Sequence, residues 1–203
     1  MKHFSMIRGF HLADFFTLAN AACGALMVFF AAAFVGTQSL QHFYLAAAMA
    51  PAAFFFDVLD GRIARWRHQQ SPLGRELDSL ADVISFGIGP AALGFAAGLQ
   101  GGWDLVALIY FVCCGVSRLA RYNVTAEDLS AGAAKVPYFE GTPIPTSVLL
   151  VVLLAIAAAQ GRLGDELWFG AAVLGPWIVH PFSLLFVLSG SLMISKTLHI
   201  PKL

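Results

Sequence analysis

Six long apolar runs constrain the fold of this chain more than any other feature of its sequence. They cover residues 12–36, 39–60, 79–99, 103–122, 143–161 and 167–190, and Gly, Pro and short polar stretches separate them. A helix that crosses the hydrocarbon core of a bilayer needs about 20 mostly apolar residues. Only 12% of the 203 residues are charged, whereas soluble domains carry about 25%. The sequence therefore predicts an all-α integral membrane protein with six transmembrane helices.

The basic residues predict how these helices are oriented. Six spans place both termini, the loop between the second and third helices and the loop between the fourth and fifth on one side. That side carries every Lys and Arg except Arg162. The positive-inside rule then places both termini in the cytoplasm of a multi-pass protein of the cell membrane. No basic tail suggests a nucleic-acid partner, and no linker divides residues 1–203 into more than one domain.

Two pairs of aspartates interrupt this apolar pattern. Asp57 and Asp60 are expected to close the second helix, and Asp78 and Asp82 to open the third. Spacings of three and four residues put each pair on one helical face. The stretch between the pairs contains Pro72 and Gly74, which suit a turn that returns the chain into the membrane. We therefore expect the two faces to converge just inside the cytoplasmic boundary.

Four neighbouring carboxylates repel one another, so either some are protonated or cations lie among them. Oxygen ligands suit hard divalent ions such as Mg²⁺, Mn²⁺ or Ca²⁺, and four aspartates are enough to bridge two of them. Gly61, Ala64 and Gly74 leave space for a large ligand, and Arg65 supplies a charged fork for phosphate. Together they describe a site for metals and a pyrophosphate. The simpler alternative is a solvated interfacial loop with interleaved ion pairs.

The same residues resemble a known family. The pattern reads Asp57-x-x-Asp60-Gly61-x-x-Ala64-Arg65, eight residues, Gly74, three residues, Asp78, three residues, Asp82. It matches the signature of the CDP-alcohol phosphatidyltransferases at all eight fixed positions and at every spacing. The resemblance implies six transmembrane helices, a homodimer, a two-metal site at the cytoplasmic boundary and transfer of a phosphatidyl group from a CDP-linked lipid. It also implies that Asp57, Asp60, Asp78 and Asp82 bind the metals, while Gly61, Ala64, Arg65 and Gly74 hold the CDP group.

Further stretches resemble the branch of the family that uses serine as the acceptor, the phosphatidylserine synthases. They are "TLANAACG", "DSLADVISFGIGPA", "SRLARYNV", "YFEGTPIPTS" and "LMISKTLHIPK". The implied reaction joins CDP-diacylglycerol and L-serine, with Asp82 both a metal ligand and the general base that takes the serine proton. Arg118 and Arg121, followed by Asn123, are candidates to bind the serine carboxylate. They suit the phosphate of inositol phosphate or glycerol phosphate equally well, and positive-inside anchoring explains the arginines too.

Two alternatives to the serine reaction stay open from the sequence. The nearer is a family relative with another acceptor, such as inositol phosphate, glycerol phosphate or choline. The more distant is a cation transporter, since carboxylates within membrane helices also form ion pathways.

Other polar or reactive residues within the apolar runs have less specific interpretations. Thr17 and Asn20 in the first helix either reach the nucleotide or bond to a neighbouring helix. His180, before Pro181 in the expected sixth helix, is interpreted as a packing or kink residue. The three cysteines have no ligand spacing and are interpreted as packing residues.

Overall fold

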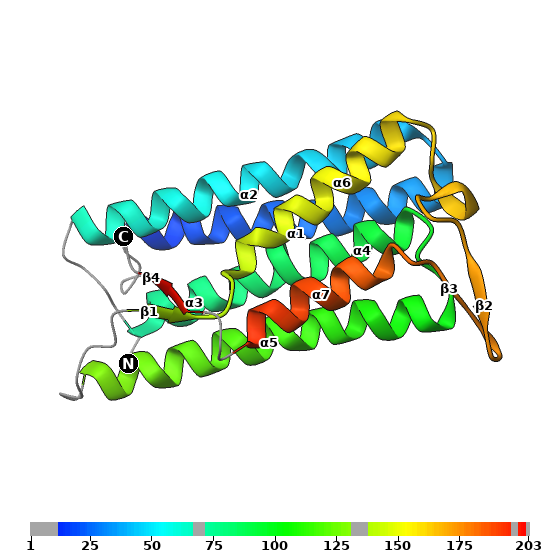
Figure 1. Cartoon of the computed structure of the whole chain (residues 1–203). Coiled ribbons are helices and arrows are strands. Elements are labelled where there is room, and N and C mark those ends of the chain that lie inside the picture. The colour runs from blue at the N-terminus through cyan, green and yellow to red at the C-terminus, as the bar shows by residue number, and fades with distance from the viewer. Residues whose placement is uncertain (1–11, 67–71, 131–137, 196–198, 202–203) are drawn as a thin grey trace, which may run out of the picture.

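The computed structural model describes residues 12–66, 72–130, 138–195 and 199–201, and at some of these, Ala64 and Arg65 among them, it describes the backbone alone. Within these residues the fold is a bundle of helices whose axes run in broadly the same direction (Figure 1). The helices are α1 (Leu12–Thr37), α2 (Leu40–Trp66), α3 (Pro72–Asp82), α4 (Gly89–Ala96), α5 (Gly102–Ser130), α6 (Val148–Ala159) and α7 (Ser183–Ile194). A π-helical segment, η2 (Val83–Ile88), joins α3 to α4, and short 3₁₀ turns form η3 (Ile144–Ser147) and η4 (Gly164–Glu166). Two antiparallel strand pairs complete the fold: β1 (Tyr138–Glu140) with β4 (His199–Pro201), and β2 (Ala172–Leu174) with β3 (Trp177–Val179).

Helices α1 and α2 form an antiparallel hairpin, as the first two apolar runs predict. Near their junction the rings of Phe34 and Phe43 meet edge to face with centroids 5.1 Å apart. Ala46, Ala50 and Ala53 of α2 are fully buried in the core. Small residues let neighbouring backbones approach closely, which helps helices to associate in lipid, where burial of apolar surface gives little advantage.

The third helical stretch starts earlier than the sequence predicts. Pro72 is the first residue of α3, a position where the missing N–H of proline costs nothing, so Pro72 and Gly74 lie in a helix rather than in the expected turn. Helix α2 likewise continues past Asp60 to Trp66, and residues 67–71 lie outside the described part of the chain. The two aspartate pairs are therefore carried on helical backbone.

Close contact between α1 and η2 holds this third stretch against the first hairpin. A side-chain carbon added at Gly24 would lie 2.6 Å from the hydroxyl oxygen of Ser85, so only glycine fits there. The Ser85 hydroxyl donates a hydrogen bond to the backbone oxygen of Asn20 at 2.8 Å. This contact fixes η2, and hence the preceding end of α3, beside the residues of α1 that face the aspartates.

The expectation that residues 167–190 form one continuous helix is wrong. Helix α7 begins only at Ser183, and the preceding apolar residues form the β2–β3 hairpin, turning at Gly175 with a φ of +66° and at Pro176. Glycine with positive φ is what a tight hairpin loop needs, while Pro176 and Pro181 interrupt a continuous helix. His180 accordingly lies outside any helix. Its ring Nδ1 is 2.6 Å from the carboxylate oxygen Oδ2 of Asp104, so it forms a polar contact instead of kinking a helix.

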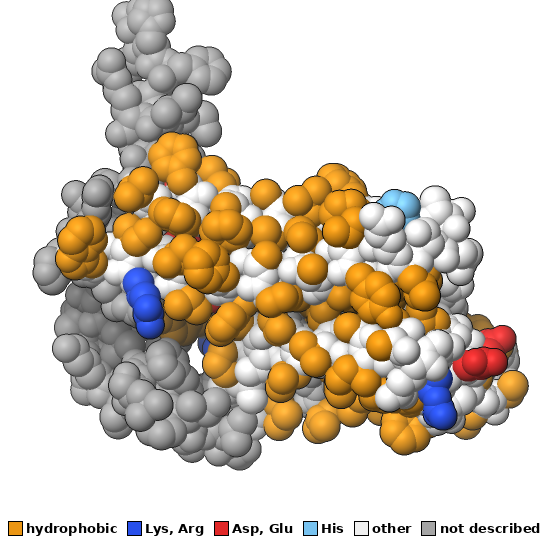
Figure 2. Space-filling view, turned by 90° about the horizontal axis from the view of Figure 1, so that it is seen from above, with side chains coloured by type: hydrophobic (Ala, Val, Ile, Leu, Met, Phe, Trp, Pro, Cys, Tyr) orange, Lys and Arg blue, Asp and Glu red, His pale blue; other side chains and the backbone are white. Residues whose placement is uncertain are grey.

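The structure is that of a predominantly helical membrane protein. Four stretches of the described chain are long and apolar enough to cross a bilayer: Leu12–Thr37, Leu40–Ile63, Leu73–Ala96 and Gly102–Val124. Two shorter apolar helices, Ile144–Ala159 and Ser183–Ile194, coincide with the fifth run and the second half of the sixth. Exposed apolar side chains cover much of the face seen in Figure 2, and charged side chains lie toward the ends. The six-span count and the cytoplasmic placement of the termini stay predictions.

Candidate functional site

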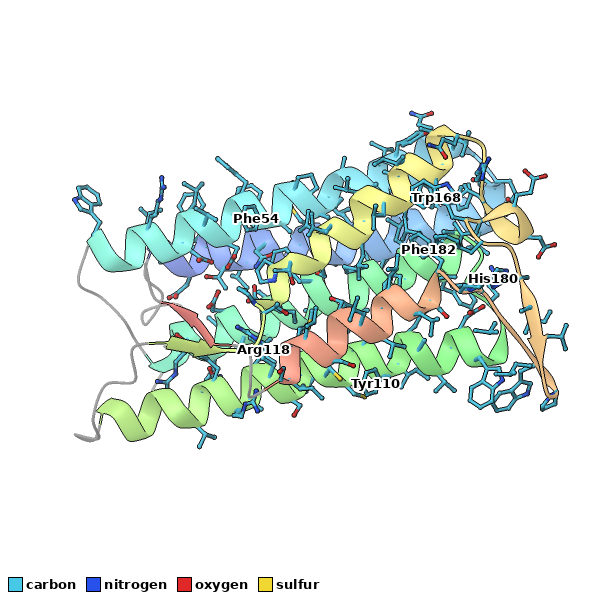
Figure 3. All side chains as sticks on the ribbon, viewed as in Figure 1. Phe54, Tyr110, Arg118, Trp168, His180 and Phe182 are labelled. Carbon is cyan, nitrogen blue, oxygen red and sulfur yellow. The ribbon has the colours of Figure 1, made fainter. Side chains whose placement is uncertain are left out.

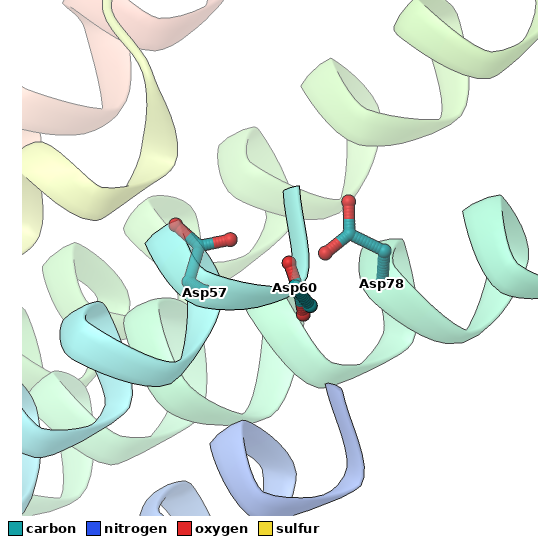
Figure 4. Close-up of side chains that lie close together, drawn as sticks. All are labelled: Asp57, Asp60 and Asp78. Carbon is teal, nitrogen blue, oxygen red and sulfur yellow. The ribbon is translucent and has the colours of Figure 1, made fainter. Parts of the chain in front are cut away.

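Three of the four predicted aspartates meet between α2 and α3. Asp57 and Asp60 lie one turn apart on α2, and Asp78 faces them from α3 (Figure 4). One carboxylate oxygen from each lies within 4.8 Å of the other two. Asp60 is buried, and the other two are half-buried. We call these three residues the aspartate cluster; it confirms the expectation that the two helical faces converge.

Asp82 lies next to the aspartate cluster but outside this closest group of described carboxylates. It is the last residue of α3 before the π-helical turn and is only 7% exposed. Its Oδ1 accepts a hydrogen bond from the Nδ2 of Asn20 at 3.2 Å. Asp57 and Asp78 are near enough to act on its charge. Asp82 thus differs from the other three aspartates in its position and in accepting a hydrogen bond from the side-chain amide of Asn20.

Two polar side chains of α1 support the carboxylates. The Thr17 hydroxyl donates to Oδ2 of Asp60 at 2.8 Å, and Asn20, one turn further on, contacts Asp82 as described. Thr17 and Asn20 are both buried. The sequence left open whether they reach the nucleotide or bond to a neighbouring helix; they bond to the aspartates of α2 and α3. A polar pair at helical spacing within an apolar run was the available signal, but it did not identify its partners.

The chemistry of the aspartate cluster fits a divalent cation. Oδ1 of Asp78 is buried and has no hydrogen-bond partner in the described part of the chain. A buried, unsatisfied carboxylate oxygen beside two further carboxylates carries a large energetic cost unless a proton or a cation compensates it. Three oxygen donors from two helices are the kind of ligand set that Mg²⁺, Mn²⁺ and Ca²⁺ prefer.

The predicted residues of the CDP-binding part lie on the same two helices. Gly61 follows Asp60 directly on α2, and Gly74 lies one turn before Asp78 on α3. Ala64 and Arg65 continue α2 beyond Gly61, and their side chains lie outside the described part of the structure. The backbone therefore places the predicted donor-binding residues on the two helices that carry the aspartate cluster.

The predicted acceptor residues all lie on α5 but have different surroundings. Arg118 is half-buried on α5 (Figure 3) and lies near enough to Asp82 for their charges to interact. Its Nε is buried and has no hydrogen-bond partner among the described residues. Asn123 instead joins α5 to α3. Its Nδ2 donates to the Glu76 carboxylate at 3.2 and 3.3 Å, and its Oδ1 accepts from Ser79 at 3.2 Å. Arg121 makes contacts of its own, so Arg118 is the candidate best placed for a substrate.

Comparison with known proteins identifies the class that this fold and site define. A model of the CDP-alcohol phosphatidyltransferase family matches residues 10–188, and the chain belongs to this family. A protein of Saccharomyces cerevisiae is 42% identical over 98% of this chain and 74% of its own length. One from Mycobacterium tuberculosis is 38% identical over 69% of this chain and 49% of its own length. One from Methanocaldococcus jannaschii is 34% identical over 73% of this chain and 62% of its own length. All three are named CDP-diacylglycerol–serine O-phosphatidyltransferase. The chain spans about half the length of the mycobacterial relative.

Proposed function

We propose that this chain is a phospholipid-synthesising enzyme that transfers a phosphatidyl group from CDP-diacylglycerol to L-serine, releasing CMP. Membership of the CDP-alcohol phosphatidyltransferase family supplies the reaction class. The serine acceptor is supported by relatives of that name that are 34–42% identical to the chain. The observation that carries the proposal is the aspartate cluster, whose carboxylates lie within 4.8 Å of one another in a chain of this family.

The aspartate cluster and Asp82 are the residues that would hold two divalent cations, Mg²⁺ or Mn²⁺, with Ca²⁺ also compatible. Bound there, such cations would neutralise the pyrophosphate of the donor and would stabilise the charge that develops as its P–O bond breaks. The Thr17 hydroxyl keeps the Asp60 carboxylate in place through its 2.8 Å hydrogen bond. Gly61, Gly74, Ala64 and Arg65 would hold the CDP group, the glycines by leaving space and the arginine by binding phosphate.

Asp82 is proposed as the general base. The serine hydroxyl oxygen attacks the phosphorus that carries the lipid, and the bond from that phosphorus to the departing CMP breaks. The hydroxyl proton passes to the Asp82 carboxylate. Because Asn20 holds Oδ1 of Asp82 at 3.2 Å, the second oxygen of this carboxylate is the one available to accept the proton.

Arg118 is proposed to bind the serine carboxylate. A guanidinium forms directional, charge-assisted hydrogen bonds with a carboxylate, and the Nε of Arg118 is a buried donor without a partner among the described residues. Its proximity to Asp82 would bring the serine hydroxyl toward the base. Arg121 and Asn123 are retained as secondary acceptor contacts, Asn123 through its position between α3 and α5.

We further propose that the site opens to the cytoplasm and that the enzyme works as a homodimer. The first proposal follows from the distribution of basic residues, all but Arg162 on one side of the predicted topology. The second follows from the resemblance to the family. In this arrangement the lipid donor enters sideways from the leaflet, while serine and CMP exchange with water.

The test is CMP release by purified protein in lipid vesicles, with one acceptor supplied at a time. L-serine should support release in the presence of Mg²⁺ or Mn²⁺, and inositol phosphate, glycerol phosphate and choline should not. Release with one of these three and not with serine would leave the family reaction intact and overturn the serine assignment. If no acceptor supports CMP release and the protein carries divalent cations across the vesicle membrane, the transporter alternative would be favoured.

A further inference from the structure

The β2–β3 hairpin carries an exposed apolar surface that the reaction does not use. It lies at the end of the bundle opposite to α3, the helix that carries Asp78 of the aspartate cluster (Figure 1). Every residue from 171 to 178 is exposed, and Val173 and Leu174 retain 77% and 60% of their accessible surface. Exposed apolar groups of this size on a short hairpin need a cover, because water solvates them poorly.

Helix α7 is too short to span a membrane alone, although the sequence predicted that the sixth apolar run would be a transmembrane helix. Its 12 residues rise about 18 Å, whereas the hydrocarbon core of a bilayer is about 30 Å thick. The hairpin occupies residues 172–179 of that run. A two-stranded sheet leaves backbone groups along both outer edges without strand partners, and such groups are not tolerated in hydrocarbon. The hairpin therefore belongs at the level of the lipid headgroups, where water and polar groups satisfy these edges.

Two tryptophans connect the hairpin to the surface of α5. Trp103, in the first turn of α5, and Trp177 of β3 pack edge to face with ring centroids 5.3 Å apart. The indole N–H of Trp103 donates to the backbone oxygen of Leu174 at 2.9 Å. Further along α5, Ile109 is 62% exposed on a helix long and apolar enough to span a membrane. The apolar surface of the hairpin thus adjoins a helix that is long and apolar enough to span a membrane. The two Trp residues lie where the hairpin and this helix meet, and Trp side chains favour the membrane–water boundary.

A buried polar contact fixes the hairpin in this position. The fully buried Asp104 carboxylate accepts the backbone N–H of His180 at 2.8 Å and that of Gly101 at 3.0 Å, and it contacts the His180 ring at 2.6 Å. Glycine is required beside it: a side-chain carbon at Gly101 would lie 2.2 Å from the backbone oxygen of Ile178, and one at Gly102 would lie 2.5 Å from the Trp177 ring. The apolar surface is therefore presented by a braced element next to the start of α5.

We propose that the β2–β3 hairpin is an interfacial anchor, whose apolar side chains insert into the headgroup region of the leaflet opposite to the aspartate cluster. Its partner is the lipid surface. The exposed charged residues Asp165 and Glu166, just before the hairpin, mark the aqueous side of the same end. Held by Asp104 and His180, the anchor sets the depth at which α7 begins, so that the sixth apolar run contains a hairpin followed by a helix.

The experiment measures the depth of an environment-sensitive fluorophore on the hairpin in phosphatidylcholine–phosphatidylglycerol vesicles. The label is attached at Val173→Cys in a background with Cys23, Cys113 and Cys114 replaced by Ala, verified by near-wild-type CMP release. Two matched positions calibrate the depth: Ile109→Cys on the exposed face of α5, and Asp165→Cys before the hairpin. Quenching is measured with lipids that carry a nitroxide near the headgroup or deep in the acyl chain, and with a water-soluble quencher.

The label at position 173 should be quenched most by the shallow nitroxide, at a depth between those of positions 109 and 165. Quenching by the aqueous reagent alone, as at position 165, would overturn the proposal, as would a depth equal to that of position 109. Mixing labelled with excess unlabelled protein should leave the result unchanged; a change would show that a second copy covers the hairpin instead of lipid. If the labelled Val173→Cys protein is inactive, Leu174→Cys gives the same comparison.

Discussion

Replacing Thr17 by valine tests how far α1 controls the aspartate cluster. Valine has nearly the shape of threonine, so the change removes the hydroxyl without opening a cavity. The nearer acceptor of this hydroxyl is Oδ2 of Asp60 at 2.8 Å, and the backbone oxygen of Ala13 lies at 3.3 Å. Both side chains are buried, with Thr17 4% and Asp60 6% exposed. A hydrogen bond to a charged group contributes about 1.5–3 kcal/mol, which corresponds to roughly a 10- to 150-fold change in an equilibrium constant. We expect Thr17→Val to raise the metal concentration for half-maximal CMP release by about that factor, because Asp60 loses the contact that orients it.

The assay is CMP release as a function of Mg²⁺ or Mn²⁺ concentration, at saturating CDP-diacylglycerol and serine. Thr17→Ser keeps a hydroxyl and should restore most of the metal affinity. Thr37→Val is the matched control, since the Thr37 hydroxyl bonds the backbone oxygen of Ala33 at 2.8 Å near the other end of the same helix. If Thr17→Val and Thr37→Val need the same metal concentration for half-maximal CMP release, or if Thr17→Val lowers only the Tm, then Thr17 contributes to packing. The reasoning about Asp60 would then fail.

The remaining predictions concern the aspartates and the acceptor. Asp57→Asn and Asp78→Asn should each abolish turnover while circular dichroism and Tm stay close to wild type, and a chelator should stop the wild-type reaction until Mg²⁺ or Mn²⁺ is restored; full activity in chelator would contradict the metal mechanism. Asp82→Asn should lower kcat by roughly 10²–10⁴-fold while largely retaining CDP-lipid affinity, and a parallel collapse of donor affinity would make Asp82 chiefly a metal ligand. Arg118→Ala should raise the KM for serine about 10- to 150-fold, with little effect on the KM for CDP-diacylglycerol, and lysine should replace it poorly. An effect on the lipid donor alone would place Arg118 with the donor, and Arg121→Ala is the comparison one turn along the same helix.

Helical periodicity was sufficient to predict the parts of the fold that depend on local sequence. The apolar runs gave α1, α2 and α5 to within a few residues at their starts, and the spacing of three residues placed Asp57 and Asp60 on one face of α2. These features follow from properties of neighbouring residues. The meeting of Asp78 with them depended on the chain reversing between α2 and α3. The sequence predicted this reversal from a turn at Pro72 and Gly74, but both residues lie in α3.

Contacts between distant residues explain what the sequence did not predict. Hydropathy treats residues 167–190 as one apolar run, because it does not distinguish a strand from a helix when both are apolar. The hairpin is selected by Gly175, Pro176 and the contact of His180 with Asp104, 76 residues earlier in the chain. Asn123 was predicted only as an acceptor contact because its partners, Glu76 and Ser79, lie on another helix.

The two polar residues of α1 also explain why the signature residues alone do not define the site. Asp60 comes from α2 and Asp82 from α3, and no local sequence rule sets the distance between these helices. Thr17 and Asn20 lie one turn apart on α1 and hold one carboxylate each, while the backbone oxygen of Asn20 accepts the hydroxyl of Ser85, three residues after Asp82. Helix α1 therefore acts as a common support. Because Thr17 and Asn20 lie one turn apart on it, their hydrogen bonds fix where Asp60 and Asp82 lie relative to each other. A shift of α1 along its axis would change the position of Asp60 relative to Asp82 and so the geometry available to a ligand between them.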